Sequence, residues 1–203
     1  MTASEETVLD AFIGLISERG FFEVTLRDVA ATADLGLADL YSLYPDKVAL
    51  AGAFMARIDA AVLAGTPRQA DPEETARDRL FDVMMRRYDA LRPHRDALRA
   101  LRRAGTRDPL LALALGPALR RSMSAMLEAA SLSSEGLAGA LRQNGLLAIH
   151  YAVSRAFDRD ETLDLSKTMA ALDNRLKMAE RWSQLFEKYT VSRRGKETGP
   201  RAT

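Results

Sequence analysis

The chain has 203 residues, of which 47% are hydrophobic and 28% charged, a composition typical of a globular protein that folds around its own core. It has no cysteine, which excludes disulfide bonds, thiolate nucleophiles and cysteine-ligated metals, and its net charge is only +1. A polar, acidic N-terminus and the lack of an apolar run long enough to cross a membrane predict a cytoplasmic protein.

The first part of the chain carries the start and stop signals of four helices. Gly20 ends the first helix, and Thr25 begins the second, where Asp28 three residues later resembles a capping box. Asp46 follows a proline and is placed to cap the fourth helix. The predicted helices of this part cover residues 5–19, 25–33, 37–43 and 47–64.

A linker over residues 65–71 separates these helices from five more. Asp71, followed by a proline and two glutamates, predicts the start of the next helix, because acids in the first turn face the positive end of the helix dipole. No segment alternates like a strand, so the predicted fold class is all-α with about nine helices, followed by a disordered basic tail over 190–203. The predicted helices of this part cover residues 72–91, 93–106, 109–130, 134–157 and 164–188.

Charge is unevenly divided along the chain. Residues 1–48 contain three basic side chains against nine acidic ones, a net charge of −6, so the remainder carries +7. Lysine and arginine supply most of the non-specific affinity of proteins for the phosphate backbone of nucleic acids. The N-terminal part therefore has the opposite charge from an ordinary DNA-binding surface.

The order of these signals nevertheless resembles the helix-turn-helix that opens the TetR family of transcriptional repressors. The resemblance is carried by the turn at Gly20, the capped helix at Thr25, and the pattern Tyr-x-x-Tyr-Pro-x-Lys over 41–47. It implies a TetR-like all-α fold with a DNA-binding head over 1–48 and a ligand-binding and dimerisation body over 49–189. It also implies that the third helix enters the major groove of an operator.

The resemblance assigns seven residues of the head to DNA contact. Gly36 stands where a capping serine is usual in the family, and Asp39, on the face that would meet DNA, is suited to accept from the amino group of cytosine. Alternatively, Thr25 only caps its helix, and Tyr41 and Tyr44 only pack against the fourth helix. The predicted DNA-binding residues are Thr25, Arg27, Leu37, Asp39, Tyr41, Tyr44 and Lys47.

Leucine and methionine are concentrated in the helices of the body. Such side chains suit an adaptable apolar pocket for a small molecule or a lipid, although an ordinary core would use the same residues. His150 either lines this pocket or lies in the core. The predicted pocket residues are Leu80, Met84, Leu98, Leu101, Leu111, Leu115, Leu119, Met123, Met126, His150 and Tyr151.

The last two predicted helices carry small and apolar residues. The TetR resemblance implies that they form a four-helix interface with the same helices of a second copy, and small residues allow such helices to approach closely. A homodimer is therefore expected. The predicted interface residues are Gly136, Ala140, Asn144, Ala148, Met169, Leu172 and Leu176.

The body is also similar to a second group, the TetR-fold accessory proteins of ubiquinone biosynthesis. The similarity lies in the runs 77–94 and 146–176 and implies a protein that binds a lipid or isoprenoid and does not bind DNA. Three interpretations are open for the nine arginines between 77 and 103. They would contact an anionic membrane surface, the acidic head of the same chain, or nearby carboxylates on solvated faces.

Nothing in the sequence predicts catalysis. His94 and His150 lack metal-binding spacing, and there is no glycine-rich phosphate loop and no nucleophile–base pair. The sequence therefore predicts no catalytic residues, no metal site and no cofactor. The leading hypothesis is a TetR-like regulator that binds DNA as a homodimer and responds to an apolar small molecule. The alternative is a lipid-binding accessory protein without DNA contact.

Overall fold

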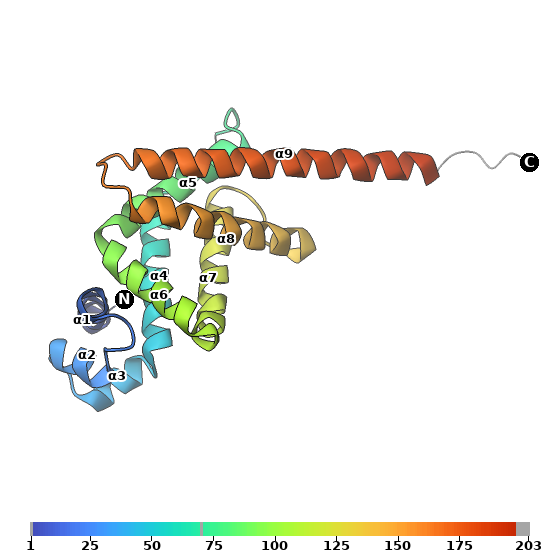
Figure 1. The fold of residues 1–203 in the computed structure, drawn as a ribbon. Helices are drawn as coiled ribbons and strands as arrows, with labels where there is room; N and C mark the ends of the chain where they lie inside the picture. Colours follow the sequence, from blue (N-terminus) through green and yellow to red (C-terminus); the bar gives the residue numbers. More distant parts are fainter. Residues whose placement is uncertain (1, 70, 198–203) are drawn as a thin grey trace, which may run out of the picture.

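The computed structural model describes the backbone of residues 2–69 and 71–197 and the side chains as far as Arg181. This part of the chain contains nine α-helices, one short 3-10 helix and no strand, which confirms the predicted all-α class (Figure 1). The helices are α1 (Ala3–Arg19), α2 (Leu26–Thr32), α3 (Leu37–Leu43), α4 (Lys47–Ala64), α5 (Ala76–Leu91), α6 (Arg95–Arg107), α7 (Pro109–Ala129), α8 (Gly136–Asp158) and α9 (Ser166–Glu197), with η1 (Arg92–His94) between α5 and α6.

The first three helices form a helix-turn-helix unit at one end of the molecule (Figure 1). Gly20 ends α1 with a φ of 89°, a conformation that glycine adopts at little cost. The predicted capping box is confirmed. Thr25 Oγ1 accepts from the N–H of Asp28 at 3.2 Å, and the Asp28 carboxylate accepts from the N–H of Thr25 at 2.8 Å.

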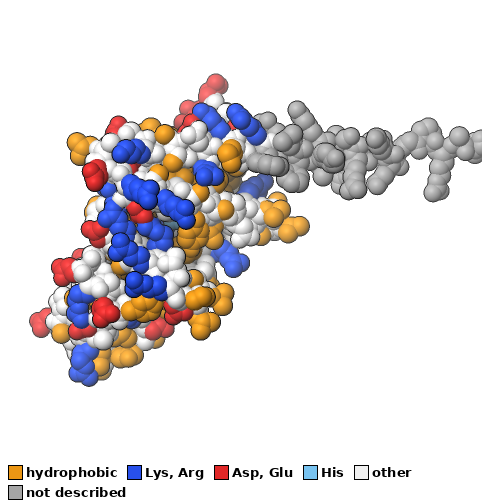
Figure 2. All heavy atoms as spheres, in the orientation of Figure 1, with side chains coloured by type: hydrophobic (Ala, Val, Ile, Leu, Met, Phe, Trp, Pro, Cys, Tyr) orange, Lys and Arg blue, Asp and Glu red, His pale blue; other side chains and the backbone are white. Residues whose placement is uncertain are grey.

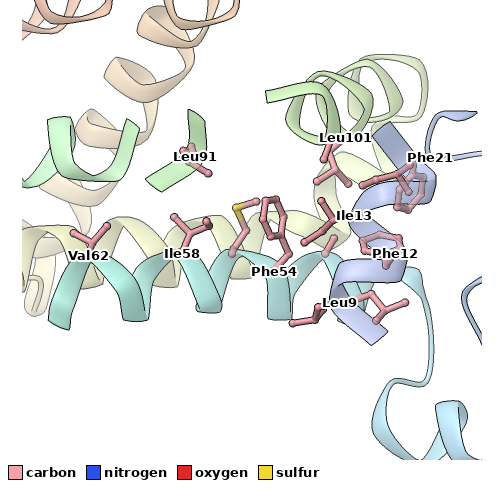
Figure 3. Close-up of a cluster of buried hydrophobic side chains, with 14 of the residues drawn as sticks. Leu9, Phe12, Ile13, Phe21, Phe54, Ile58, Val62, Leu91 and Leu101 are labelled. Atoms are coloured by element: carbon pink, nitrogen blue, oxygen red, sulfur yellow. The ribbon is translucent and has the colours of Figure 1, made fainter. Parts of the chain in front are cut away.

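Helix α4 connects this unit to the other helices, and one continuous hydrophobic core runs along it. In Figure 3, Phe12 and Ile13 of α1 face Phe54 of α4, with Leu101 of α6 close by. All four side chains are buried, and the core continues through them without a gap at the predicted boundary near residue 48. The first helix therefore packs against α4 and α6 of the body as well as against α2 of the head.

Helix α5 begins four residues later than predicted, at Ala76. Its N-cap is Thr75, whose hydroxyl oxygen accepts from the N–H of Asp78 at 3.2 Å. Asp71, the predicted cap, instead closes a turn by accepting from the N–H of Glu73 at 2.9 Å. The predicted start was wrong because a threonine with an acid three residues later satisfies the first turn of the helix better.

Apart from the end of α9, the other helix boundaries lie within two residues of the predicted ones. Helix α8 begins two residues later, at Gly136, because the hydroxyl groups of Ser124 and Ser134 bond to each other at 2.7 Å and Ser134 does not cap the helix. Helix α9 continues past residue 188 to Glu197, since no proline interrupts it. The rest of the predicted tail, residues 198–203, lies outside the described residues.

Asp160 joins α8 to α9 through the loop between them. Its buried carboxylate accepts from the N–H and hydroxyl of Thr168, at 2.7 and 2.8 Å, and from the N–H and hydroxyl of Thr162, at 3.2 and 2.5 Å. Burial raises the pKa of Asp160, but these hydrogen bonds outweigh it and lower the pKa to about 2. The carboxylate is therefore ionised, and it fixes the start of α9.

Replacing Asp160 by alanine is expected to lower the free energy of unfolding by about 2–4 kcal/mol, because buried N–H and hydroxyl groups lose their acceptor. Since the folded-state pKa lies below the ordinary 3.8, the contribution is complete above that pH and is lost as the pH falls toward 2. Denaturant unfolding at pH 7 measures the effect. The control is Asp164→Ala, which removes one exposed cap bond to Ser166. Equal losses in both variants would contradict the prediction.

Candidate functional site

A cavity of about 250 Å³ lies between α4, α5, α6, α7 and α8. Six predicted pocket residues line it: Leu98, Leu101, Leu115, Leu119, His150 and Tyr151. The other five, Leu80, Met84, Leu111, Met123 and Met126, lie outside its lining. Among the lining residues that the sequence prediction missed are Ala51, Met55, Arg87, Tyr88, Arg102 and Phe157. Ala51 and Met55 are one turn apart on α4, and this spacing is the signal that identifies α4 as a wall.

The cavity has an apolar wall and a polar wall. Helices α4 and α7 contribute only apolar side chains, such as Met55 and Leu115. Helices α5, α6 and α8 contribute the polar ones, which are Arg87, Tyr88, Arg102, Thr106, His150, Tyr151 and Ser154. A molecule in this cavity would therefore contact hydrocarbon on one side and hydrogen-bonding groups on the other.

Two arginines supply the charge of the cavity wall. Arg87 is fully buried and forms an ion pair with Asp59, which also accepts from the hydroxyl of Ser122 at 2.7 Å. Arg102 forms an ion pair with Asp158. Within the described part of the chain, no carboxylate lines the cavity, so the charges nearest to a bound molecule are both positive.

His150 and Tyr88 meet in the polar wall. Their rings are stacked with centroids 5.8 Å apart, and the Tyr88 hydroxyl lies 3.2 Å from Nδ1 and 3.4 Å from the backbone oxygen of His150. Burial, followed by the charges of Arg87 and Arg102, lowers the pKa of His150 to about 3. Burial also raises the pKa of Tyr88. Both rings are therefore neutral near pH 7.

Part of the predicted DNA-binding set lies on the surface of the head. The carboxylate of Asp39 folds toward the N-terminus of its own helix, since a Cβ on Gly36 would lie only 2.7 Å from Asp39 Oδ2. An acid at that position is stabilised by the helix dipole. The exposed members of the set are Thr25, Arg27, Asp39 and Tyr41, and Leu37 is half-buried.

Lys47 and Tyr44, the other two members, are used within the protein. Lys47 Nζ donates to the backbone oxygens of Phe21 and Val24, both at 2.7 Å, and lies 4.5 Å from the centre of the Phe21 ring. Burial lowers the pKa of Lys47. Tyr44 is buried in the core. The contacts of Lys47 therefore hold the segment between α1 and α2 against the start of α4.

Most of the nine arginines between 77 and 103 are held by contacts inside the protein, which favours the third of the interpretations above. Figure 2 shows basic side chains gathered over the region of α6, with hydrophobic side chains beside them over α7 and α8. Arg77, Arg87, Arg99 and Arg102 pair with carboxylates. Arg79, Arg86 and Arg92 donate to the backbone oxygens of Ala130, Gly65 and Leu163.

The predicted dimer residues are divided between the surface and the core. Leu137 and Leu141 of α8 are 81% and 65% exposed, and together with predicted residues they form an apolar stripe along this helix. The exposed members of the predicted set are Gly136, Ala140, Asn144, Ala148 and Met169. Leu172 and Leu176 of α9 are buried within the chain itself.

Two further observations concern all the described residues. No three His, Asp or Glu side chains among the described residues come together in a way that could hold a metal ion. None of the described helices combines the length and the apolar character that crossing a membrane requires.

The arrangement of helices is that of TetR-family transcriptional regulators. The TetR regulator from Nitrosomonas europaea ATCC 19718 aligns with 87% of this chain over 97% of its own, with a TM-score of 0.69 and 21% identity. TetR regulators from Rhodococcus sp. RHA1 and Streptomyces coelicolor align with 87% and 98% of this chain over 94% and 92% of their own. Their TM-scores are 0.63 and 0.58, and their identities 19% and 18%. The chain therefore has the TetR fold. No family model matches the sequence, and no curated protein matches it.

Proposed function

We propose that the protein is a TetR-like transcriptional regulator. Residues 1–48 would bind an operator, and residues 49–189 would bind a small molecule and form a homodimer. The observation that carries this proposal is the position of α6, which lines the cavity with Leu98 and Arg102 and also packs against α1. A ligand that binds better to one position of α6 would therefore favour one position of the head.

The apolar stripe on α8 supports the homodimer. Leu137 and Leu141 are large side chains left in solvent, and α8 packs against α9 along the same side of the molecule (Figure 1). An exposed apolar stripe beside a second helix suits a self-complementary interface between two copies. In the proposed dimer, the two heads would be held at a fixed spacing and would contact two half-sites of an operator.

Arg27→Ala is expected to weaken DNA binding about fivefold, because it removes an exposed cation from the surface that would meet phosphates. The measurement is fluorescence anisotropy with the DNA upstream of the protein's own gene, at about 50 mM salt, where electrostatic binding is strong. The matched control is Arg68→Ala, an exposed arginine between α4 and α5. Equal weakening by both variants would remove the assignment of Arg27. No binding by the unmodified protein would overturn the regulator function.

The head also supports a second candidate function, a lipid-binding protein without DNA contact. The net charge of −6 over residues 1–48 opposes contact with phosphates, and Lys47 is already bonded to two backbone oxygens. Native mass spectrometry of the purified protein separates the two candidates. A co-purified lipid together with no DNA binding supports the second, whereas an empty dimer that binds its upstream DNA supports the first.

A further inference from the structure

The charge in the wall of the cavity limits what it can bind. Arg87 and Arg102 line the cavity, while their partners Asp59 and Asp158 do not. Nε of Arg87 is buried and has no hydrogen-bond partner among the described residues. The nearest charges to a bound molecule are thus positive, and in a largely apolar space they attract an anion and repel a cation.

The hydrogen bonds around His150 leave one donor for a ligand. The Tyr88 hydroxyl lies 3.2 Å from Nδ1 and 3.4 Å from the backbone oxygen of His150, which also accepts from the Ser154 hydroxyl at 2.7 Å. We assign the Tyr88 proton to the shorter of these two contacts, the one to Nδ1. The proton of the neutral ring then lies on Nε2, which makes no hydrogen bond within the described part of the chain. An unpaired N–H at the edge of an apolar cavity gains from an acceptor supplied by a ligand.

The remaining walls set the size and shape of the ligand. The volume of about 250 Å³ is below the range of roughly 300–1,000 Å³ occupied by drug-sized ligands. Tyr88 and Phe157 lie with their ring centres 5.1 Å apart on one side, and Met55 and Leu115 contribute to the opposite, apolar wall. These walls suit one or two fused rings.

We propose that the cavity binds a small aromatic carboxylic acid as its anion, with the ring on the apolar wall and the carboxylate accepting from His150 Nε2 and paired with Arg102. This proposal rests on the proposed function in one respect, that the acid would be the small molecule to which the regulator responds. Binding itself requires no DNA. The low pKa of His150 agrees with a neutral donor, so the affinity for such an anion is expected to be constant between about pH 6 and 8.

Calorimetry of the full-length protein without DNA tests the charge. The probes are 2-naphthoate, 2-naphthamide and 2-(aminomethyl)naphthalene, which share a ring and differ in charge. Naphthoate is expected to bind at least about tenfold more tightly than the amide, since a charge-assisted hydrogen bond is stronger than a neutral one. The amine is expected not to bind. Equal binding of acid and amide, tighter binding of the amine, or no naphthoate binding up to about 1 mM would overturn the proposal.

Substitutions on α6 test the position of the carboxylate. Arg102→Met is expected to lower naphthoate affinity about tenfold and to leave naphthamide affinity nearly unchanged, whereas Arg102→Lys retains most of it. The matched control is Arg103→Met, the adjacent residue, which lies outside the cavity lining and is expected to change neither. Because Arg102 also pairs with Asp158, each variant's unfolding midpoint is measured. An equal loss of acid and amide binding in Arg102→Met would show a structural effect and overturn the assignment.

Nitrogen NMR of His150 gives a readout independent of ligand binding. A proton on Nε2 is expected, and a proton on Nδ1 would overturn the proposed hydrogen bond to the carboxylate.

Failure of the proposed ligand site and failure of the proposed regulator function give different results. A protein that selects naphthoate but never binds DNA loses the regulator function and keeps this site. A protein that binds DNA without selecting the acid keeps the regulator function and loses this site.

Discussion

Asp59→Ala is expected to lower the free energy of unfolding by about 3–5 kcal/mol, the range for removing one partner of a buried ion pair. The partner left behind is Arg87, which is fully buried and has its ion pair with Asp59. Its other polar contact within the described part of the chain is a long one, from Nη2 to Met55 Sδ at 3.9 Å. An unpaired guanidinium in this position has neither water nor a counter-charge to stabilise it.

Two further variants show whether the charge causes the loss. Asp96→Ala removes the exposed pair between Asp96 and Arg99 and is expected to cost less than about 1 kcal/mol. The double variant Asp59→Leu with Arg87→Met removes both charges and is expected to recover most of the stability, since an apolar pair of similar volume avoids the desolvation cost. Denaturant unfolding measures all three. A double variant as unstable as Asp59→Ala would assign the loss to packing.

Stability is expected to fall by about 2–3 kcal/mol between pH 7 and pH 4.5 through His150 alone. The pKa of this side chain is lowered from 6.5 to about 3 by burial and by the charges of Arg87 and Arg102. Between pH 6.5 and about pH 3, His150 is protonated in the unfolded chain but stays neutral in the folded protein. The free energy of unfolding is therefore not reduced by His150 above pH 6.5, and it is reduced progressively as the pH falls from 6.5 to about 3.

The measurement is the free energy of unfolding at several pH values in the unmodified protein and in His150→Gln. Glutamine can accept from Tyr88 but does not titrate, so its pH profile lacks this component. Carboxylates and His94 titrate in both proteins, and the difference between the two profiles isolates His150. Parallel profiles between pH 7 and 4.5 would show that His150 is not buried in its neutral form.

Helix ends that depend on residues close by in the sequence were predictable from the sequence. The bounds of α3 agree with the prediction, and Gly20, Thr25, Asp46 and Asp108 end or begin helices through atoms no more than four residues away. The start of α5 was mispredicted because two local signals compete. Only the observed hydrogen bonds show that Thr75 caps α5 rather than Asp71.

The polar half of the cavity could not be predicted in the same way. Arg87 and Asp59 are 28 residues apart, and a lone arginine on an amphipathic helix normally lies in solvent. The acceptors of Lys47 are 23 and 26 residues away, so its place in the TetR-like pattern gives no sign that it is bonded internally. Periodicity identifies which helix face is apolar, whereas pairs of this kind depend on how the helices are assembled.

The bonding of Lys47 has a consequence for how the head would respond to ionic strength. Of the other two cations in residues 2–48, Arg19 donates to the backbone oxygen of Glu23 and pairs with Asp28, whereas Arg27 is exposed and makes no hydrogen bond or ion pair within the described part of the chain. A dimer would thus displace about two condensed counterions from DNA. With a slope of about 0.9 per phosphate, its affinity would fall only about tenfold between roughly 50 and 200 mM salt. Such a regulator would hold its operator mainly through backbone N–H and hydroxyl groups, and its affinity would depend far less on salt than that of a protein with many lysine and arginine contacts to phosphates.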